Sequence, residues 1–145
     1  KGQAMFIPAG IPHAYLKGNI VECMASSDNV IRAGLTGKFK DTPALLEVSN
    51  QKSVVKFSPK SANYVYSAPV REFRVTKMDM KAGKKQTEKS DSVRMLLILR
   101  GKLKLTWRGG SLNIQQGQSI LLPANLSEVG IECLEPAELY KADVP

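Results

Sequence analysis

Residues 102–114 read Lys-Leu-Lys-Leu-Thr-Trp-Arg-Gly-Gly-Ser-Leu-Asn-Ile, an alternation of polar and apolar residues on both sides of a glycine pair. Successive side chains of an extended strand point to opposite faces, so a period of two is typical of a half-buried strand. Arg108-Gly109-Gly110 supplies a turn between the two alternating runs. This stretch therefore predicts a β-hairpin.

Strand patterns continue on the N-terminal side of this hairpin. Phe73–Met80 alternates in the same way, and Met95–Leu99 is a short, continuous apolar run that predicts a strand buried on both faces. The one good helix candidate is Pro43–Val48, with Asp41 or Thr42 placed to cap it and proline in the first turn. We therefore predict an all-β fold with one short helix, either a sandwich or a small barrel.

A weak internal repeat supports two related β units. Gly2–Ala9 (GQAMFIPA) matches Gly117–Ala124 (GQSILLPA), and a Glu-Cys pair follows each copy, at residues 22–23 and 132–133. Strand-rich sequence precedes the second copy but only Lys1 precedes the first, so we expect the first unit to be present only as its closing part. Glu128 stands in the second copy where the first has His13, so a second metal centre is not expected.

The composition is that of an ordinary soluble domain. The 145 residues are 43% hydrophobic and 23% charged. No apolar run approaches the ~18 residues of a membrane span, and the first residues lack the apolar core of a signal peptide. We expect a soluble, non-secreted, cytoplasmic protein with no membrane partner.

The net charge of +8 is concentrated in the middle of the chain. Residues 51–110 carry 15 Lys/Arg against 4 Asp/Glu. Nucleic-acid binding through Lys81, Lys84 and Lys85 is one interpretation, but no aromatic residues are interleaved there for bases to stack on. Other lysines alternate with apolar neighbours, which predicts the solvated face of strands, and we favour that interpretation. They are Lys56, Lys77, Lys102 and Lys104.

His13 is the only histidine, and the two cysteines, Cys23 and Cys133, lack metal-binding spacing. We expect both thiols to be reduced and buried. A lone histidine is by default a surface or hydrogen-bonded structural residue. His13, however, follows Pro12 on an extended segment, and Tyr15 lies two residues on, so imidazole and phenol are expected to face one pocket.

These residues belong to a longer set of motifs. Pro-His-Ala-Tyr-Leu at residues 12–16, Glu-Cys-Met-Ala-Ser-Ser-Asp-Asn-Val at 22–30 and Arg-Ala-Gly-Leu-Thr at 32–36 resemble type I mannose-6-phosphate isomerase. The resemblance implies a cupin or jelly-roll β-barrel and zinc-dependent interconversion of mannose 6-phosphate and fructose 6-phosphate in carbohydrate metabolism. Residues 1–50 would then be the closing part of the catalytic cupin unit, and residues 51–145 a C-terminal cupin-like domain with a structural role.

The resemblance also assigns roles to single residues. His13 falls on the family's C-terminal zinc-ligating histidine, and Arg32 on the active-site arginine. The family usually has proline before the pocket lysine, whereas Gly37 precedes Lys38 here. Four residues fall on positions that line the same pocket: Tyr15, Glu22, Asp28 and Lys38.

The residue types suit the implied chemistry. Aldose–ketose isomerisation moves a proton between neighbouring carbons and develops negative charge on oxygen, which zinc stabilises as a Lewis acid. Arg32 could stabilise the same charge, and Lys38 could meet the phosphate. Either Glu22 or Asp28 could act as the base or orient another group.

A zinc site needs three or more protein ligands, and this chain offers one histidine. In the family, the other ligands are a glutamine, a histidine and a glutamate upstream of this segment. We therefore expect the chain alone to bind zinc poorly and to be inactive, and to need the N-terminal part of its own protein as a partner as well as a sugar phosphate. The alternative is a non-catalytic cupin-like module that binds or senses a sugar phosphate.

Overall fold

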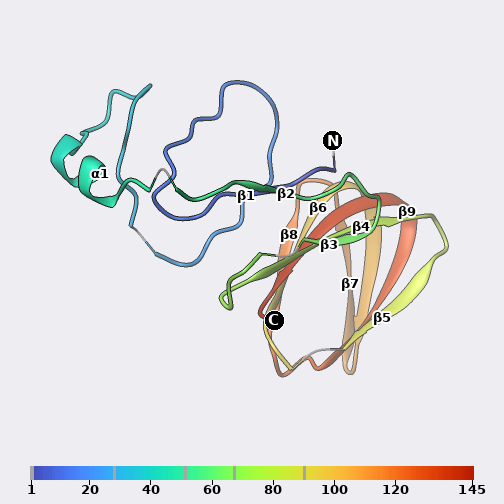
Figure 1. The fold of residues 1–145 in the computed structure, drawn as a ribbon. Helices are drawn as coiled ribbons and strands as arrows, with labels where there is room; N and C mark the ends of the chain where they lie inside the picture. The colour runs from blue at the N-terminus through green and yellow to red at the C-terminus, as the bar shows by residue number, and fades with distance from the viewer. Residues whose placement is uncertain (1, 28, 51, 67, 90) are drawn as a thin grey trace.

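The computed structural model describes residues 2–27, 29–50, 52–66, 68–89 and 91–145. Its main sheet has the strand order β3-β4-β9-β6-β7, with β5 paired to β9 and β8 paired to β6, all antiparallel. Figure 1 shows this sheet curled into a barrel, so the predicted all-β fold is confirmed. The seven strands are β3 (Tyr64–Tyr66), β4 (Arg74–Met80), β5 (Lys85–Lys89), β6 (Arg94–Trp107), β7 (Gly110–Gln115), β8 (Ser119–Leu122) and β9 (Glu128–Asp143).

The two long strands, β6 and β9, pair with each other along most of their length. Each of them also pairs with two shorter strands. β9 pairs with β5 through residues 128–132 and with β4 through residues 137–143, while β6 pairs with β8 through residues 94–97 and with β7 through residues 102–107. The predicted hairpin at residues 102–114 is the β6–β7 pair, and the predicted strand at residues 73–80 is β4, so both predictions are confirmed.

A bulge in β6 keeps apolar side chains on the inside of the barrel along the whole strand. Leu96 and Ile98 are buried before it, and Leu103 and Leu105 after it, so the inward positions change from even to odd numbers. The pairing with β9 shifts register between Ile98 and Leu103. An extra residue in one strand has this effect on the facing of side chains.

The core is one continuous apolar cluster between the walls of the barrel. Trp107, Ile120 and Leu126 pack against its edge. Its buried members are Met78, Met80, Leu96, Ile98, Leu103, Leu105, Ile114, Leu122, Val129, Ile131, Cys133, Ala137 and Leu139.

The prediction that Met95–Leu99 is buried on both faces is wrong. Leu96 and Ile98 are 0% exposed, but Met95 and Leu99 are 48% and 38% exposed. The outer face of this part of β6 is open to solvent, and an uninterrupted apolar run does not show which of its two faces is covered.

One end of the barrel interior is closed by charged side chains. Asp143 accepts hydrogen bonds from Arg74 at 2.9 and 2.7 Å, and the Lys141 ammonium donates to Glu88 at 2.7 Å. Arg94 is 0% exposed and donates to the Glu88 carbonyl at 3.3 Å. Buried charges are tolerated because each has partners of opposite charge or hydrogen-bond acceptors.

A two-stranded ribbon lies outside the main sheet. β1 (Met5–Phe6) pairs antiparallel with β2 (Lys56–Phe57). Gly2 and Gly117, which begin the two copies of the repeat, have φ values of +78° and +83°, a region that glycine enters without steric cost. The two copies therefore begin with glycines of similar backbone conformation.

The one helix among the described residues, α1 (Thr42–Val48), agrees with the predicted one. Asp41 caps it, because the carboxylate accepts a hydrogen bond from the Ala44 N–H at 3.0 Å, and Pro43 occupies the first turn. No helix within the described ranges has the length and apolar character that crossing a membrane requires. Both cysteines are free thiols, Cys133 buried as expected and Cys23 only half-buried.

Lys77 contradicts the prediction that the alternating lysines form a solvated face. Its side chain is 5% exposed and lies within 2.7 Å of the Asp79 carboxylate and 3.9 Å of that of Glu138. Strand alternation correctly places Lys77 away from the core. Residues before β4 cover it, however, and this contact depends on tertiary structure.

Candidate active site

The predicted site residues lie in the segment between β1 and α1, which has no regular secondary structure in its described residues. Nδ1 of His13 lies 3.0 Å from the carbonyl oxygen of Ile11. A carbonyl can only accept, so Nδ1 carries the proton in this bond, and in the neutral ring the lone pair is on Nε2. Such a bond orients imidazole as a ligand through Nε2.

Tyr15 lies beside His13, although both side chains are exposed. The two ring centroids are 5.6 Å apart, with the planes tilted by 60°. The Tyr15 hydroxyl donates to Oε1 of Glu22 at 2.8 Å. This hydrogen bond, together with partial burial and the negative charge of Glu22, raises the pKa of Tyr15. Imidazole, phenol and carboxylate therefore form one connected group.

Arg32 and Lys38 do not join this group. Both side chains are exposed, and within the described residues neither makes a hydrogen bond or an ion pair. The Lys38 N–H donates to the Thr36 hydroxyl at 3.2 Å, which shapes the local backbone only. Leu35 between them has a φ of +53°, an uncommon conformation for a residue with a side chain. Asp28, the remaining predicted site residue, lies outside the described residues.

The described residues do not make a zinc site by themselves. No group of three His, Cys, Asp or Glu side chains comes together anywhere in the described part of the chain. His13 is thus one possible ligand that belongs to no such group of three, and a tetrahedral site needs more ligands.

The second copy of the repeat has a different arrangement at the corresponding positions. When the copies are aligned from Gly2 and Gly117, Glu128 matches His13 and Gly130 matches Tyr15. The Glu-Cys pairs follow at a spacing five residues shorter in the second copy, and they match Glu132 with Glu22. Glu128 forms an ion pair with Lys89 at 3.2 Å, and both side chains are largely exposed.

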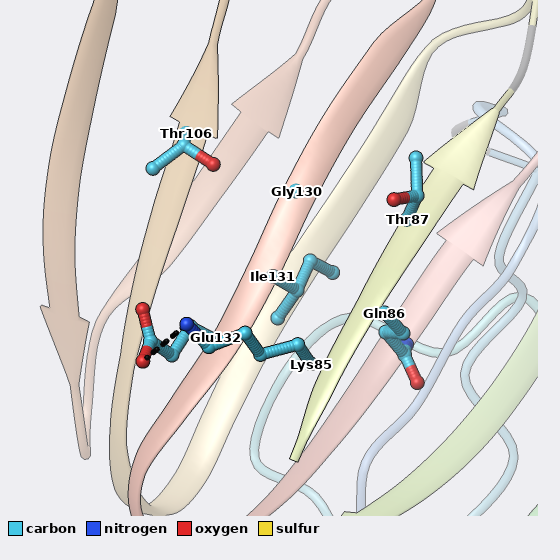
Figure 2. Close-up of a pocket in the computed structure, with 7 residues that line it drawn as sticks. All are labelled: Lys85, Gln86, Thr87, Thr106, Gly130, Ile131 and Glu132. Carbon is cyan, nitrogen blue, oxygen red and sulfur yellow. Dashed lines mark ion pairs between the residues drawn. The ribbon is translucent and has the colours of Figure 1, made fainter. Parts of the chain in front are cut away.

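Gly130 and Glu132 line a shallow pocket of about 420 Å³ on the outer face of β5, β9 and β6, shown in Figure 2. Gly130 lies between Thr87 and Thr106 on the neighbouring strands. A Cβ at Gly130 would lie 2.5 Å from the Thr106 hydroxyl oxygen, so a tyrosine there could not occupy this backbone position without movement of Thr106. The Lys85–Glu132 ion pair of 3.2 Å crosses the pocket. None of its seven lining residues is a histidine or cysteine, and the pattern of the sequence did not predict the pocket.

Comparison with protein families connects this fold to a known one. The family model described as "Mannose-6-phosphate isomerase, cupin domain" matches residues 63–134. These residues run from β3 into β9 and include the β6–β7 hairpin.

Curated relatives extend the similarity to the segment that carries His13. Mannose-6-phosphate isomerase from Macaca fascicularis is 36% identical over 95% of this chain and 36% of its own length. The mouse protein of the same name is 39% identical over 83% of this chain and 34% of its own length. The chain therefore spans about a third of the length of these relatives.

A solved structure shows the same architecture. Mannose 6-phosphate isomerase from Salmonella typhimurium, bound to its substrate F6P and to zinc, has 25% sequence identity and a TM-score of 0.66. The match covers 83% of this chain and 32% of that protein.

Proposed function

The chain belongs to the mannose-6-phosphate isomerase family, and from this premise we propose that the protein containing it interconverts mannose 6-phosphate and fructose 6-phosphate. The observation that carries the proposal is the His13–Tyr15–Glu22 group, because it joins an oriented imidazole to a hydrogen-bonded phenol and carboxylate. The reaction moves a proton between neighbouring carbons, and such a transfer needs an acid or base within hydrogen-bond reach.

In this proposal, His13 provides one zinc ligand through Nε2, and other parts of the protein provide the rest. Two observations support a shared site: the described residues gather no group of three His, Cys, Asp or Glu side chains, and the chain spans only about a third of the length of its relatives. The structure determined for the Salmonella relative contains zinc. The N-terminal part of the same protein is the partner that we propose for residues 11–40.

We propose separate roles for the charged residues of the segment. The Glu22 carboxylate holds the Tyr15 hydroxyl and is one candidate for moving the proton; Asp28 is the other. Arg32 stabilises negative charge that develops on the sugar oxygens, and Lys38 binds the phosphate as a point charge. Their exposure supports a role toward a ligand, because neither side chain is engaged by the described residues. The two free cysteines fit a reducing compartment, so we place the protein in the cytoplasm.

A coupled isomerase assay with zinc titration tests this function. It compares the 145-residue chain with a longer protein that includes the preceding sequence of its gene. We expect turnover and one bound zinc only in the longer protein, and loss of both in His13→Ala. No turnover by the longer protein would overturn the proposal. Stoichiometric zinc and full turnover by the short chain would overturn the shared site.

A second function is supported by one observation. Arg32 and Lys38 are both exposed, and this suits a protein that binds an anionic sugar phosphate without isomerising it. In that case, fructose 6-phosphate would bind to the longer protein equally well with and without zinc, and Arg32→Ala would weaken binding although no turnover is seen.

A further inference from the structure

The contact between the ribbon and the main sheet is built around a buried lysine and a tyrosine. The ribbon is defined here as residues 2–10 together with residues 54–58. Besides the β1–β2 pairing, the Ser58 N–H donates to the Ala4 carbonyl at 2.9 Å, and the Asn50 N–H donates to the Gly10 carbonyl at 2.8 Å. His13 follows three residues after Gly10, so the position of its segment depends on that of the ribbon.

The ribbon has little to hold it in place by itself. A pair of strands with no further sheet or helix is marginally stable in water. Large apolar side chains of this ribbon are exposed: Met5 by 52%, Val54 by 73% and Phe57 by 67%. Phe6 and Ile7 are half-buried, and no apolar side chain of the ribbon is fully buried, so burial alone holds the ribbon weakly and an attachment elsewhere adds to it.

The attachment lies on the outer face of β3 and β4. The Tyr66 hydroxyl donates to the carbonyl oxygen of Gly2 at 2.9 Å, across 64 residues of sequence. Tyr66 is only 8% exposed, and its ring is stacked on Tyr140 of β9 with a centroid distance of 6.5 Å. The hydroxyl is thus fixed to the main sheet by its ring and to the ribbon by its hydrogen bond.

Lys77 lies beneath the same contact. Its ammonium donates to the Asp79 carboxylate at 2.7 Å and to the Ala62 carbonyl at 3.3 Å, which draws the chain before β3 over β4. A Cβ built on Gly2 would lie 3.7 Å from Cε of Lys77 and 3.3 Å from the Ser61 carbonyl, so Gly2 packs directly on this layer. The buried ammonium is well partnered, as a charge in such a place must be.

The second copy of the repeat has a different attachment at its glycine. The Gly117 N–H donates to the Ile98 carbonyl at 2.9 Å, so that copy is bonded directly into β6 of the main sheet. Gly2 instead accepts a side-chain hydrogen bond. The side chains of Tyr66 and Lys77 therefore attach the first copy to the main sheet, whereas the backbone of β6 attaches the second copy.

We propose that Tyr66 and Lys77 are positioning residues that hold the ribbon, and with it the His13 segment that follows, on the seven-stranded sheet. This gives residues 51–145 a role in the proposed isomerase reaction. The part of this proposal that concerns catalysis rests on the proposed function. The anchoring itself can be tested without activity, by measuring amide exchange.

Tyr66→Phe removes the hydroxyl and keeps the stacked ring. Tyr64→Phe is the matched control, since Tyr64 contacts the Tyr66 ring edge-to-face at 5.2 Å and its hydroxyl makes no hydrogen bond within the described residues. Native-state hydrogen exchange on the 145-residue chain should show about fivefold faster exchange in residues 3–10 for Tyr66→Phe, the effect of one lost hydrogen bond. Exchange in β6 and β9 should not change, and Tyr64→Phe should match the wild type.

Unchanged exchange in Tyr66→Phe, an equal change in Tyr64→Phe, or faster exchange spread over β6 and β9 would overturn the proposal. Lys77→Met is a second variant that acts on the same contact and should loosen the same residues. In the longer enzyme, below its unfolding temperature, Tyr66→Phe with Lys77→Met should lower kcat roughly tenfold and leave KM for the sugar phosphate nearly unchanged, because misplacement of a distant catalytic group affects the chemical step. Absence of turnover in the wild-type enzyme would overturn the proposed function, and the exchange measurement would still decide the anchor.

Discussion

Gly101 in β6 lies so close to the backbone of Pro136 in β9 that a Cβ at Gly101 would clash with the Pro136 carbonyl oxygen. Gly101 also has a φ of +83°. Both features occur at the bulge, where the inward-facing positions of β6 change parity. The two longest strands of the barrel therefore depend on one position that only glycine can occupy without displacement of the backbone.

Gly101→Ala should destabilise the chain strongly. Gly109→Ala is the control, because Gly109 also has a positive φ of +100° but no atom lies within 4 Å of its Cβ position. The control should cost about 1–2 kcal/mol from the backbone conformation alone. Gly101→Ala should cost at least about 2 kcal/mol more because of the contact with β9. Urea unfolding measures both, and equal losses in the two variants would contradict the close approach.

Asp143→Asn should break the charged cluster at the end of the barrel. The side chain of Asp143 is 3% exposed, and it receives two hydrogen bonds from Arg74. The Arg74 side chain is 41% exposed, so solvent screens part of this interaction, and loss of the charge-assisted hydrogen bonds should cost about 1.5–3 kcal/mol. In contrast, Glu128→Gln removes an exposed pair with Lys89 and should cost less than about 1 kcal/mol. Chemical denaturation of the two variants would show whether burial decides the difference.

Tyr66 should make the chain less stable at alkaline pH. Burial is the main cause that raises the pKa of Tyr66 to about 12, and the neighbouring Tyr140 contributes. Between the ordinary tyrosine value near 10 and this value, the folded chain keeps a proton that the unfolded chain has lost. Stability therefore falls as pH rises from about 10 to about 12, by up to roughly 2–3 kcal/mol.

Tyr66→Phe removes this ionisation. The variant should lose less stability between pH 10 and pH 12 than the wild type does, when unfolding is measured at several pH values in that range. Tyr64→Phe again serves as the control. A parallel fall in all three proteins would show that Tyr66 does not account for the alkaline loss.

Glu22→Gln should lower the pKa of Tyr15. The hydrogen bond from the Tyr15 hydroxyl to the Glu22 carboxylate is the main cause of the raised pKa, and an amide carries no charge to repel the phenolate. A Tyr15 resonance followed by NMR during an alkaline titration measures the shift. Glu128→Gln is the control here also, and a Tyr15 pKa unchanged by Glu22→Gln would mean that the pair does not form in solution.

Local sequence patterns were sufficient to predict most of the individual strands and the helix. The alternation around Arg108-Gly109 predicts the β6–β7 hairpin, and Asp41 before Pro43 predicts the start of α1, because strand facing and helix capping depend on residues close in sequence. The motif at residues 12–16 likewise places His13 and Tyr15 side by side. Sequence spacing did not connect Arg32 or Lys38 to them, and the described residues bring neither into contact with that pair.

The sequence by itself determined the all-β class, the hairpin, the capped helix and the two-copy repeat, because each is encoded in the period and identity of neighbouring residues. Tertiary structure decided which strand faces are covered. Lys77 alternates like a solvent-facing lysine yet is buried under residues 61–62, while Met95 belongs to an apolar run yet is half-exposed. The physical reason is that alternation fixes the direction of a side chain relative to its strand, whereas burial depends on segments distant in sequence that cover that face.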